Sequence, residues 1–150
     1  MSDAIDLASL SKPAFLAHWF QRVWTEEDPA AIEQMMAGDA AIKGMGNVAS
    51  VGPADFKVFQ QSLLAKITDI RFTILHAVED GNWMAALWSL TARDRETGKP
   101  VSTTGTVFVE IRDGKFTGGY NHFDAFGMYQ DMGLLPQDTI PRLLSGSALQ

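Results

Sequence analysis

The sequence contains no cysteine, and this absence removes several kinds of chemistry at once. Disulfide bonds, thiolate metal ligands and cysteine nucleophiles are all excluded. Positive charge is also scarce: 12 Lys and Arg side chains stand against 18 Asp and Glu side chains, which gives a formal net charge of −6. Proteins that bind nucleic acid usually carry a basic patch or stripe, so we expect no nucleic-acid partner.

Long apolar runs are absent as well. A membrane-crossing helix needs about 20 consecutive apolar residues, and no run approaches that length. The first six residues are acidic and lack the basic start and apolar core of a signal peptide. We therefore expect a cytoplasmic protein with no membrane partner.

The overall composition is typical of a globular domain: the chain has 150 residues, of which 46% are hydrophobic and 20% are charged. A chain of this length buries about 70% of the surface of its unfolded state, which is enough for a core and a pocket. We expect one domain over residues 1–150, with its core at about 12–136 and a loose tail at 141–150.

The first half of the chain carries three helix patterns. Ser11 is a suitable N-cap, and Pro13 lies in the first turn, where a missing N–H costs little. The apolar residues that follow have helical spacing and predict one broad buried face: Phe15, Leu16, Trp19, Phe20, Val23 and Trp24. Similar start signals predict a second helix from residue 28 to 36 and a third from residue 52, with a short strand at 40–43 between them.

From residue 69 onward the apolar residues recur at every second position, which is the spacing of a strand. Turn signals such as Asp80-Gly81 divide this half into four strands, at 70–78, 83–92, 101–111 and 115–124. Helices followed by an antiparallel meander predict an α+β fold. We expect the sheet to curl around the first helix as a cone, with a cavity at its open end.

The last predicted strand carries three side chains that could do chemistry. Tyr120, His122 and Asp124 occupy every second position, so they share one face. Asp124 ends the strand under an apolar segment at 125–135, which is where a buried acid/base would lie. His122 could share its proton, and Tyr120 could donate to a developing oxyanion. A helix cap at Asp124 and ordinary packing explain the same residues without catalysis.

Four further residues are candidates for ligand binding. Trp19 and Trp24 lie on the apolar face of the first helix, where they line the cavity or simply belong to the core. Trp88 lies in the apolar strand 83–92. Thr104 could bond a ligand if its face of the strand turns inward, and it is routine β-branched surface if that face turns outward.

Several segments match a known pattern. Val51-Gly-Pro-Ala-Asp-Phe opens the third helix, and the ending runs through Asp113-Gly-Lys-Phe, then Tyr120-Asn-His-Phe-Asp, then Gly127 to Pro136. This ending is close to the family signature of DGK, an aromatic residue, an Asp and a segment like LGLLQQLGLLP. The chain thus resembles the SnoaL-like polyketide cyclase family of the NTF2-like superfamily over roughly residues 15–136.

The resemblance implies an NTF2-like cone with a deep apolar pocket for a small molecule, usually in a dimer. In the family's cyclases an Asp at the position that matches Asp124 acts as acid/base in an intramolecular aldol closure, with no metal and no organic cofactor. Tyr120 falls where an aromatic residue, often Trp, is usual. We accordingly expect no cofactor here.

Two functions stay open on this evidence. One is cyclase or isomerase chemistry on an apolar carbonyl compound, with Asp124 as the base. The other is a non-catalytic ligand-binding or dimerisation module. Epoxide hydrolysis would need a second carboxylate and an arginine around a water, and the sequence offers no such set. We expect no metal site, because His18 and His76 lack partner ligands at metal-binding spacing.

The strand 83–90 predicts a homodimer, because it is apolar on both faces. Its two faces are Trp83, Ala85 and Leu87 on one side, and Met84, Ala86, Trp88 and Leu90 on the other. Helices can cover only one face, and soluble monomers rarely expose a large apolar patch. Two copies paired through the bare face, around a twofold axis, would cover it. The alternative is that residues 134–144 fold back over it.

Overall fold

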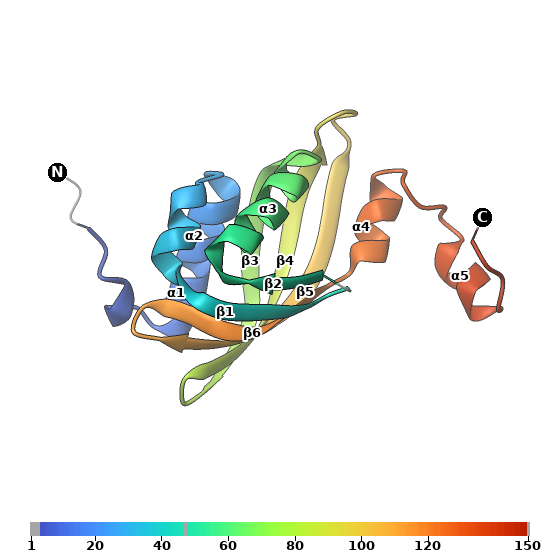
Figure 1. Ribbon diagram of the computed structural model, residues 1–150. Coiled ribbons are helices and arrows are strands. Elements are labelled where there is room, and N and C mark those ends of the chain that lie inside the picture. Colours follow the sequence, from blue (N-terminus) through green and yellow to red (C-terminus); the bar gives the residue numbers. More distant parts are fainter. Residues whose placement is uncertain (1–3, 47, 150) are drawn as a thin grey trace.

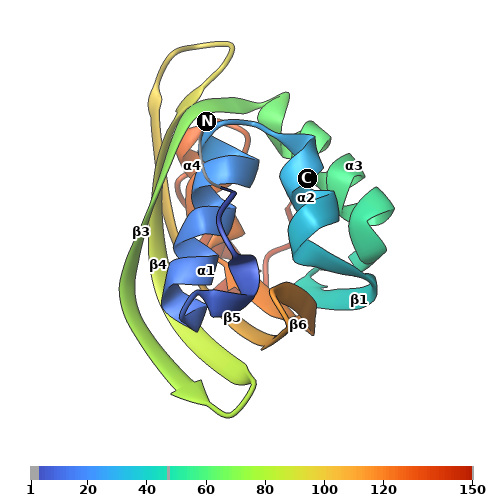
Figure 2. The same cartoon turned by 90° about the vertical axis from the view of Figure 1, so that its left-hand side faces the viewer.

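Six strands form one curved sheet in the order β2-β1-β6-β5-β4-β3. In the computed structural model, which describes residues 4–46 and 48–149, the strands are β1 (Met36–Met45), β2 (Val48–Val51), β3 (Ile67–Asp80), β4 (Trp83–Asp94), β5 (Pro100–Arg112) and β6 (Lys115–Phe123). β1 and β6 run parallel, and all other neighbours run antiparallel. The sheet does not close on itself but curls around the N-terminal helices (Figures 1 and 2). The predicted α+β cone is confirmed.

The helices are η1 (Leu7–Ser9), α1 (Lys12–Trp19), η2 (Phe20–Thr25), α2 (Pro29–Met35), α3 (Gly52–Leu64), α4 (Ala125–Asp131) and α5 (Thr139–Leu144). α1 continues without a break into η2, which is one widened π-helical turn. The predicted N-caps are present: the Ser11 hydroxyl accepts from the Ala14 N–H at 3.2 Å, and the Asp28 carboxylate accepts from the Ala30 N–H at 2.9 Å. None of the helices in the described part of the chain has the length and apolarity to cross a bilayer.

The segment between α2 and α3 differs from the prediction. α2 ends one residue earlier than expected, and the short strand at 40–43 is the middle of the longer β1. β2 was not predicted, because the glycines at 44 and 46 suggest a loop. Their φ values of 91° and 71° instead serve the tight return from β1 into β2.

An aromatic cluster fills the space between α1, α3 and the sheet. Phe116 on β6 meets the rings of Phe15 and Trp19 edge-on, at 4.9 and 5.0 Å between centroids. On the other side, Phe20 stacks on Phe72 of β3 at 3.9 Å. These contacts tie the first helical segment to the inner strand β6 and to the edge strand β3, and they leave the cavity between them.

No helix of the described residues lies over the opposite, outer face of the sheet (Figure 2). Residues 141–144, which we expected in a loose tail, belong to α5, and α5 lies beyond α4 at the C-terminal end (Figure 1). The described tail therefore does not fold back over the outer face.

Candidate functional site

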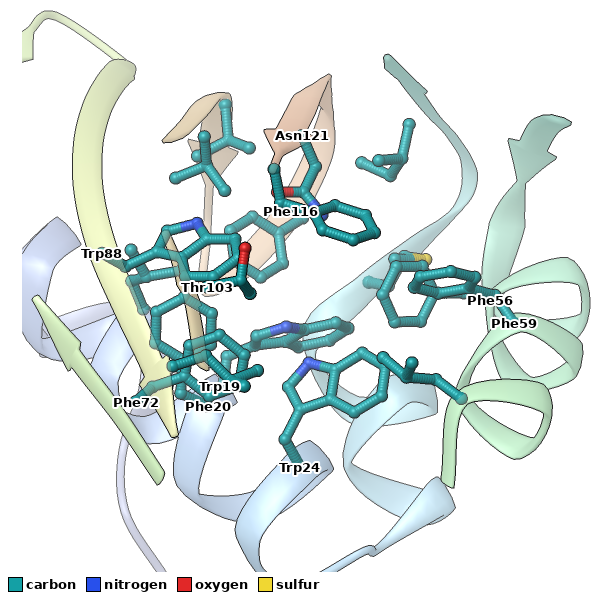
Figure 3. A pocket seen from close by; sticks show the side chains of 18 of the residues that line it. Trp19, Phe20, Trp24, Phe56, Phe59, Phe72, Trp88, Thr103, Phe116 and Asn121 are labelled. Atoms are coloured by element: carbon teal, nitrogen blue, oxygen red, sulfur yellow. The ribbon is translucent and has the colours of Figure 1, made fainter. Parts of the chain in front are cut away.

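The cavity lies between the concave face of the sheet and the helices, as predicted. It measures about 70 Å³, and the whole recess, counted with the solvent space at its mouth, measures about 720 Å³. Its lining is almost entirely apolar and aromatic (Figure 3): Leu16, Trp19, Phe20, Trp24, Met36, Ile42, Phe56, Phe59, Leu63, Phe72, Trp88, Leu90, Thr103, Val107, Val109, Phe116, Asn121, Phe123 and Met128.

Strand alternation decides which side chains reach the cavity. In β5 the odd-numbered residues from 101 to 111 are buried, whereas the even-numbered residues 102 to 108 are exposed. Phe108 pairs with Tyr120 on β6 and shares its outer face, so Asn121 and Phe123 turn inward. In the part of β6 from Gly119 to Phe123, the inward face is therefore the odd-numbered one.

Trp19, Trp24 and Trp88 all line the cavity. Trp19 and Trp24 come from α1 and η2, where the apolar stripe faces the sheet. Trp88 comes from β4, and its indole lies across β5 because residue 105 is a glycine: a Cβ there would stand 2.3 Å from Cζ2 of the indole. That these three side chains hold a ligand stays a prediction.

Tyr120 and His122 do not line the cavity, so the predicted placement is wrong for both. Their shared face is right, but it is the outer one, where Tyr120 is 43% exposed and His122 is exposed too. The Lys43 ammonium lies 6.0 Å from the Tyr120 ring centroid, and the His122 ring packs against the backbone of Gly44. Thr104 shares this outer face and is exposed.

The placement was wrong for a physical reason. The alternation of side chains along a strand shows which residues share a face, but it does not show which face of the sheet the helices cover. Tyr120, His122 and Asp124 are polar at alternate positions, as the solvent-facing residues of a half-buried strand usually are. The apolar neighbour Phe123 is the better indicator of the buried side, and it lines the cavity. Phe116 lines the cavity too, although its number is even, because the register with β5 shifts between the Ile111–Phe116 and Glu110–Gly118 pairs.

Asp124 is an exposed residue that caps α4. Its carboxylate accepts a hydrogen bond from the Gly127 N–H at 2.9 Å, and it is absent from the cavity lining. The expectation of a buried Asp124 beside the pocket is therefore corrected. Its backbone carbonyl does reach toward the cavity, because it accepts from the hydroxyl of Thr103 at 2.8 Å.

The polar residues of the cavity are ones that the sequence analysis missed. Asn121 and Thr103 are the polar lining residues, together with the N–H of the Trp88 indole (Figure 3). Asn121 Oδ1 and Trp88 Nε1 are buried and have no hydrogen-bond partner among the described residues. The available signal was the two-residue period of the strands. Asn121 lies two residues from the apolar Phe123, and Thr103 lies two residues from the apolar Val101, so each shares a strand face with an apolar residue.

No cluster of three His, Asp or Glu side chains that could hold a metal ion occurs within residues 4–46 and 48–149. His76 is exposed on β3, and His18 is half-buried on α1. The charged pair Glu110 and Arg112 lies on β5, where hydrogen bonds from Arg112 and Thr117 hold the pKa of the Glu110 carboxyl below its usual value. Neither of these features touches the cavity.

The comparisons with known proteins agree with this fold. A family model described as the SnoaL-like domain matches residues 16–118, and the chain belongs to that family. The matched region ends just before Tyr120, so it covers the cone but not the segment from Tyr120 to Pro136. No curated protein matches the chain.

Three solved structures illustrate the fold. A candidate polyketide cyclase from Acidithiobacillus ferrooxidans is 22% identical over 89% of this chain and 98% of its own, with a TM-score of 0.73. A protein with a ketosteroid isomerase-like fold from Catenulispora acidiphila, solved in complex with trimethylamine, is 16% identical over 83% of this chain and 96% of its own. Its TM-score is also 0.73. An LEH-like epoxide hydrolase from Mycobacterium tuberculosis is 16% identical over 89% of this chain and 96% of its own, with a TM-score of 0.62. These likenesses show the fold, an NTF2-like or ketosteroid isomerase-like cone.

The chemistry available inside the cavity follows from its lining. Among the described lining residues none is Asp, Glu, His, Lys, Arg or Tyr. General acid/base catalysis needs a titratable group within hydrogen-bond reach of the proton that moves. Removal of apolar surface from water, by contrast, favours binding and needs no titratable group. The lining is suited to hold a molecule rather than to exchange protons with it.

Proposed function

We propose that this SnoaL-like protein binds a small, largely apolar molecule in its cavity and does not carry out acid/base chemistry on it. The observation that supports this function is the lining itself, which is rich in Trp and Phe and has no titratable side chain among the described residues. Pockets for small molecules are concave, mostly apolar and supplied with a few placed polar groups. Neither a metal nor an organic cofactor takes part in this proposal.

The size of the site limits what enters. An enclosed apolar cavity of about 150 Å³ is enough for benzene, and the cavity here is about 70 Å³ within a recess of about 720 Å³. A ring-sized ligand therefore occupies part of the mouth as well, or displaces flexible lining side chains such as Met36 and Leu63. Methionine is suited to this because its side chain is unbranched and adaptable.

The test is binding of 2-methylnaphthalene, followed by fluorescence of the cavity tryptophans. We expect saturable binding to the natural protein and its loss in Val109→Phe, because the larger side chain fills the cavity. The matched control is Val78→Phe on the outer face, which should bind normally. Equal binding by both variants, or no binding of 2-methylnaphthalene or of its hydroxylated analogue 2-naphthol by the natural protein, would refute a ligand cavity.

Acid/base catalysis by Asp124, with His122 and Tyr120 as partners, is the second candidate function. It is favoured by the position of Asp124, which directly follows the lining residue Phe123 and whose carbonyl accepts from the lining residue Thr103. Likeness to a candidate polyketide cyclase adds to it. The carboxylate would have to leave the Gly127 N–H and turn toward the cavity mouth. Under this function the substrate is an apolar carbonyl compound.

We also propose that two copies pair through the outer face of the sheet. The strand register sets Val78, Ala85, Phe108 and Tyr120 in one row across four adjacent strands. Val78 is 68% exposed and Phe108 is 50% exposed, and Phe108 stacks with Trp83 at 4.9 Å. Such a contiguous apolar row is rare on soluble monomers, and a twofold pairing would cover it.

A further inference from the structure

We propose that the ligand of this cavity carries a hydroxyl group, which accepts a hydrogen bond from the indole N–H of Trp88 and donates one to the side-chain oxygen of Asn121. This inference rests on the proposed function and adds the chemical class of the ligand: an apolar ring compound with a phenol or alcohol group. It uses the two buried polar atoms that the fold leaves without a partner.

Trp88 is the donor, and its position is fixed on both sides. Its indole meets Phe72 at 5.1 Å and Phe20 at 6.1 Å between ring centroids, and the side chain is only 4% exposed. Below it, Gly105 leaves the space that a Cβ would occupy. An indole held this firmly cannot turn its N–H to solvent, and an indole nitrogen can only donate. None of the described residues supplies an acceptor, so that place is left to a bound molecule.

Asn121 is the acceptor. Its amide nitrogen donates to the sulfur of Met45 at 3.7 Å, so the amide oxygen is turned away from Met45, and Asn121 itself lines the cavity. The oxygen is buried and has no donor among the described residues. Asn121 pairs with Val107, one inward position along β5 from the Gly105 that carries the Trp88 indole. Figure 3 shows the Trp88 indole, the Asn121 amide and the Thr103 hydroxyl among the side chains that line the cavity.

A donor and an acceptor from residues that line the same cavity select a hydroxyl over a ketone. A hydroxyl oxygen accepts from Trp88 while its hydrogen is donated to Asn121. A ketone could accept from Trp88, but it would leave the Asn121 oxygen unpaired. A hydrocarbon would leave both unpaired, and a buried unpaired polar atom is strongly unfavourable. Thr103 does not supply the missing donor, because its hydroxyl hydrogen is already donated to the Asp124 carbonyl at 2.8 Å.

The test compares three probes that share one ring skeleton. These are 2-naphthol, which donates and accepts, 2-tetralone, which only accepts, and 2-methylnaphthalene, which does neither. Dissociation constants are measured by calorimetry on the natural protein and on three variants. Trp88→Phe removes the donor, Asn121→Leu removes the acceptor, and Phe59→Leu is the control that changes only apolar contact in the same cavity.

We expect the natural protein to bind 2-naphthol about tenfold or more tightly than 2-methylnaphthalene, with 2-tetralone between them, as two hydrogen bonds of ordinary strength imply. In Asn121→Leu the preference for 2-naphthol over 2-tetralone should vanish. Trp88→Phe should reduce the preference of both oxygenated probes over 2-methylnaphthalene. Phe59→Leu should weaken all three probes by a similar factor and leave their order unchanged.

The other outcomes separate this inference from the proposed function. Tight binding of all three probes with no preference for 2-naphthol overturns the hydroxyl assignment and leaves the apolar site in place. Equal binding of 2-tetralone and 2-naphthol also overturns it, because the amide would then present its NH₂ group. No binding of any probe contradicts the proposed function itself.

Discussion

The indole of Trp88 lies over Gly105, and a Cβ at residue 105 would stand 2.3 Å from Cζ2 and 2.7 Å from Cη2 of that indole. The two residues face each other in the register of β4 and β5. The glycine therefore lets a large aromatic side chain lie flat across the neighbouring strand. This contact fixes the position of the Trp88 indole in the cavity lining and the direction of its N–H.

Gly105→Ala is expected to destabilise the protein by about 1–3 kcal/mol, because the added methyl group has no space under the indole. The free energy of unfolding from urea titration measures this loss. The matched control is Gly118→Ala on β6, where a Cβ would meet only the Ala41 carbonyl at an ordinary 3.6 Å. Equal stability of the two variants would show that the indole does not occupy the position described.

Asp124 gives a second prediction, which separates capping from catalysis. As an N-cap, Asp124→Ala should lower helix stability by about 0.5–2 kcal/mol, whereas Asp124→Asn should be nearly neutral because Asn caps equally well. Amide hydrogen exchange at Gly127 reports the local effect. If a substrate is turned over, a loss of at least ~100-fold in Asp124→Asn, with α4 intact, would instead support acid/base catalysis.

The pair formed by Arg22 and Asp28 gives a prediction about pH. The side-chain hydrogen bond from Arg22 is the main cause that holds the pKa of Asp28 below its ordinary value of 3.8. A carboxyl group with a lowered pKa stabilises the fold fully above the unfolded value, and this contribution is lost as the pH falls through the folded value. Both side chains are partly exposed, so the effect is small.

In an NMR titration of the carboxyl carbons, Asp28 should therefore show a midpoint below 3.8 in the natural protein. Arg22→Gln removes the cation and should move the midpoint upward, toward 3.8. An unchanged midpoint in the variant would mean that Arg22 is not the cause of the shift.

The dimer proposal predicts a particle mass of twice 16.4 kDa by light scattering at micromolar concentration. Phe108→Lys places a charge in the middle of the apolar row and should return the mass to that of one chain. Val58→Lys is the matched control, since Val58 is an exposed apolar residue on α3, 64% exposed against 50% for Phe108, and lies away from the sheet face. A mass of 16.4 kDa for the natural protein contradicts the pairing.

Much of the fold could be predicted from local patterns. Ser11 and Asp28 do cap their helices, and the turn at Asp80-Gly81 joins β3 and β4 as expected. These features depend on residues close together in the chain. The parallel pairing of β1 with β6 could not be predicted in this way, because it joins segments far apart in the sequence. β2 lies next to β1 in the chain, but the glycines at 44 and 46 suggest a loop there.

The site was harder to predict, for a reason that β6 makes clear. Alternation correctly grouped Tyr120 with His122, but the group faces outward, while Asn121 between them faces the cavity. Which face is covered depends on the helices that pack against it, and local periodicity does not contain that information. Sequence alone therefore predicts Tyr120 and His122 for the cavity, because their side chains suit acid/base chemistry, and it misses the amide of Asn121.

The central claim is that a small molecule binds inside the cone, and the four tryptophans allow one direct measurement of it. Trp19, Trp24 and Trp88 line the cavity, whereas Trp83 is stacked on Phe108 at the outer face. In a two-dimensional ¹H–¹⁵N spectrum, the indole N–H signals of the first three should shift when 2-naphthol is added, and that of Trp83 should stay in place. Shifts confined to Trp83, or no shift in any of the four signals at saturating 2-naphthol, would contradict the account.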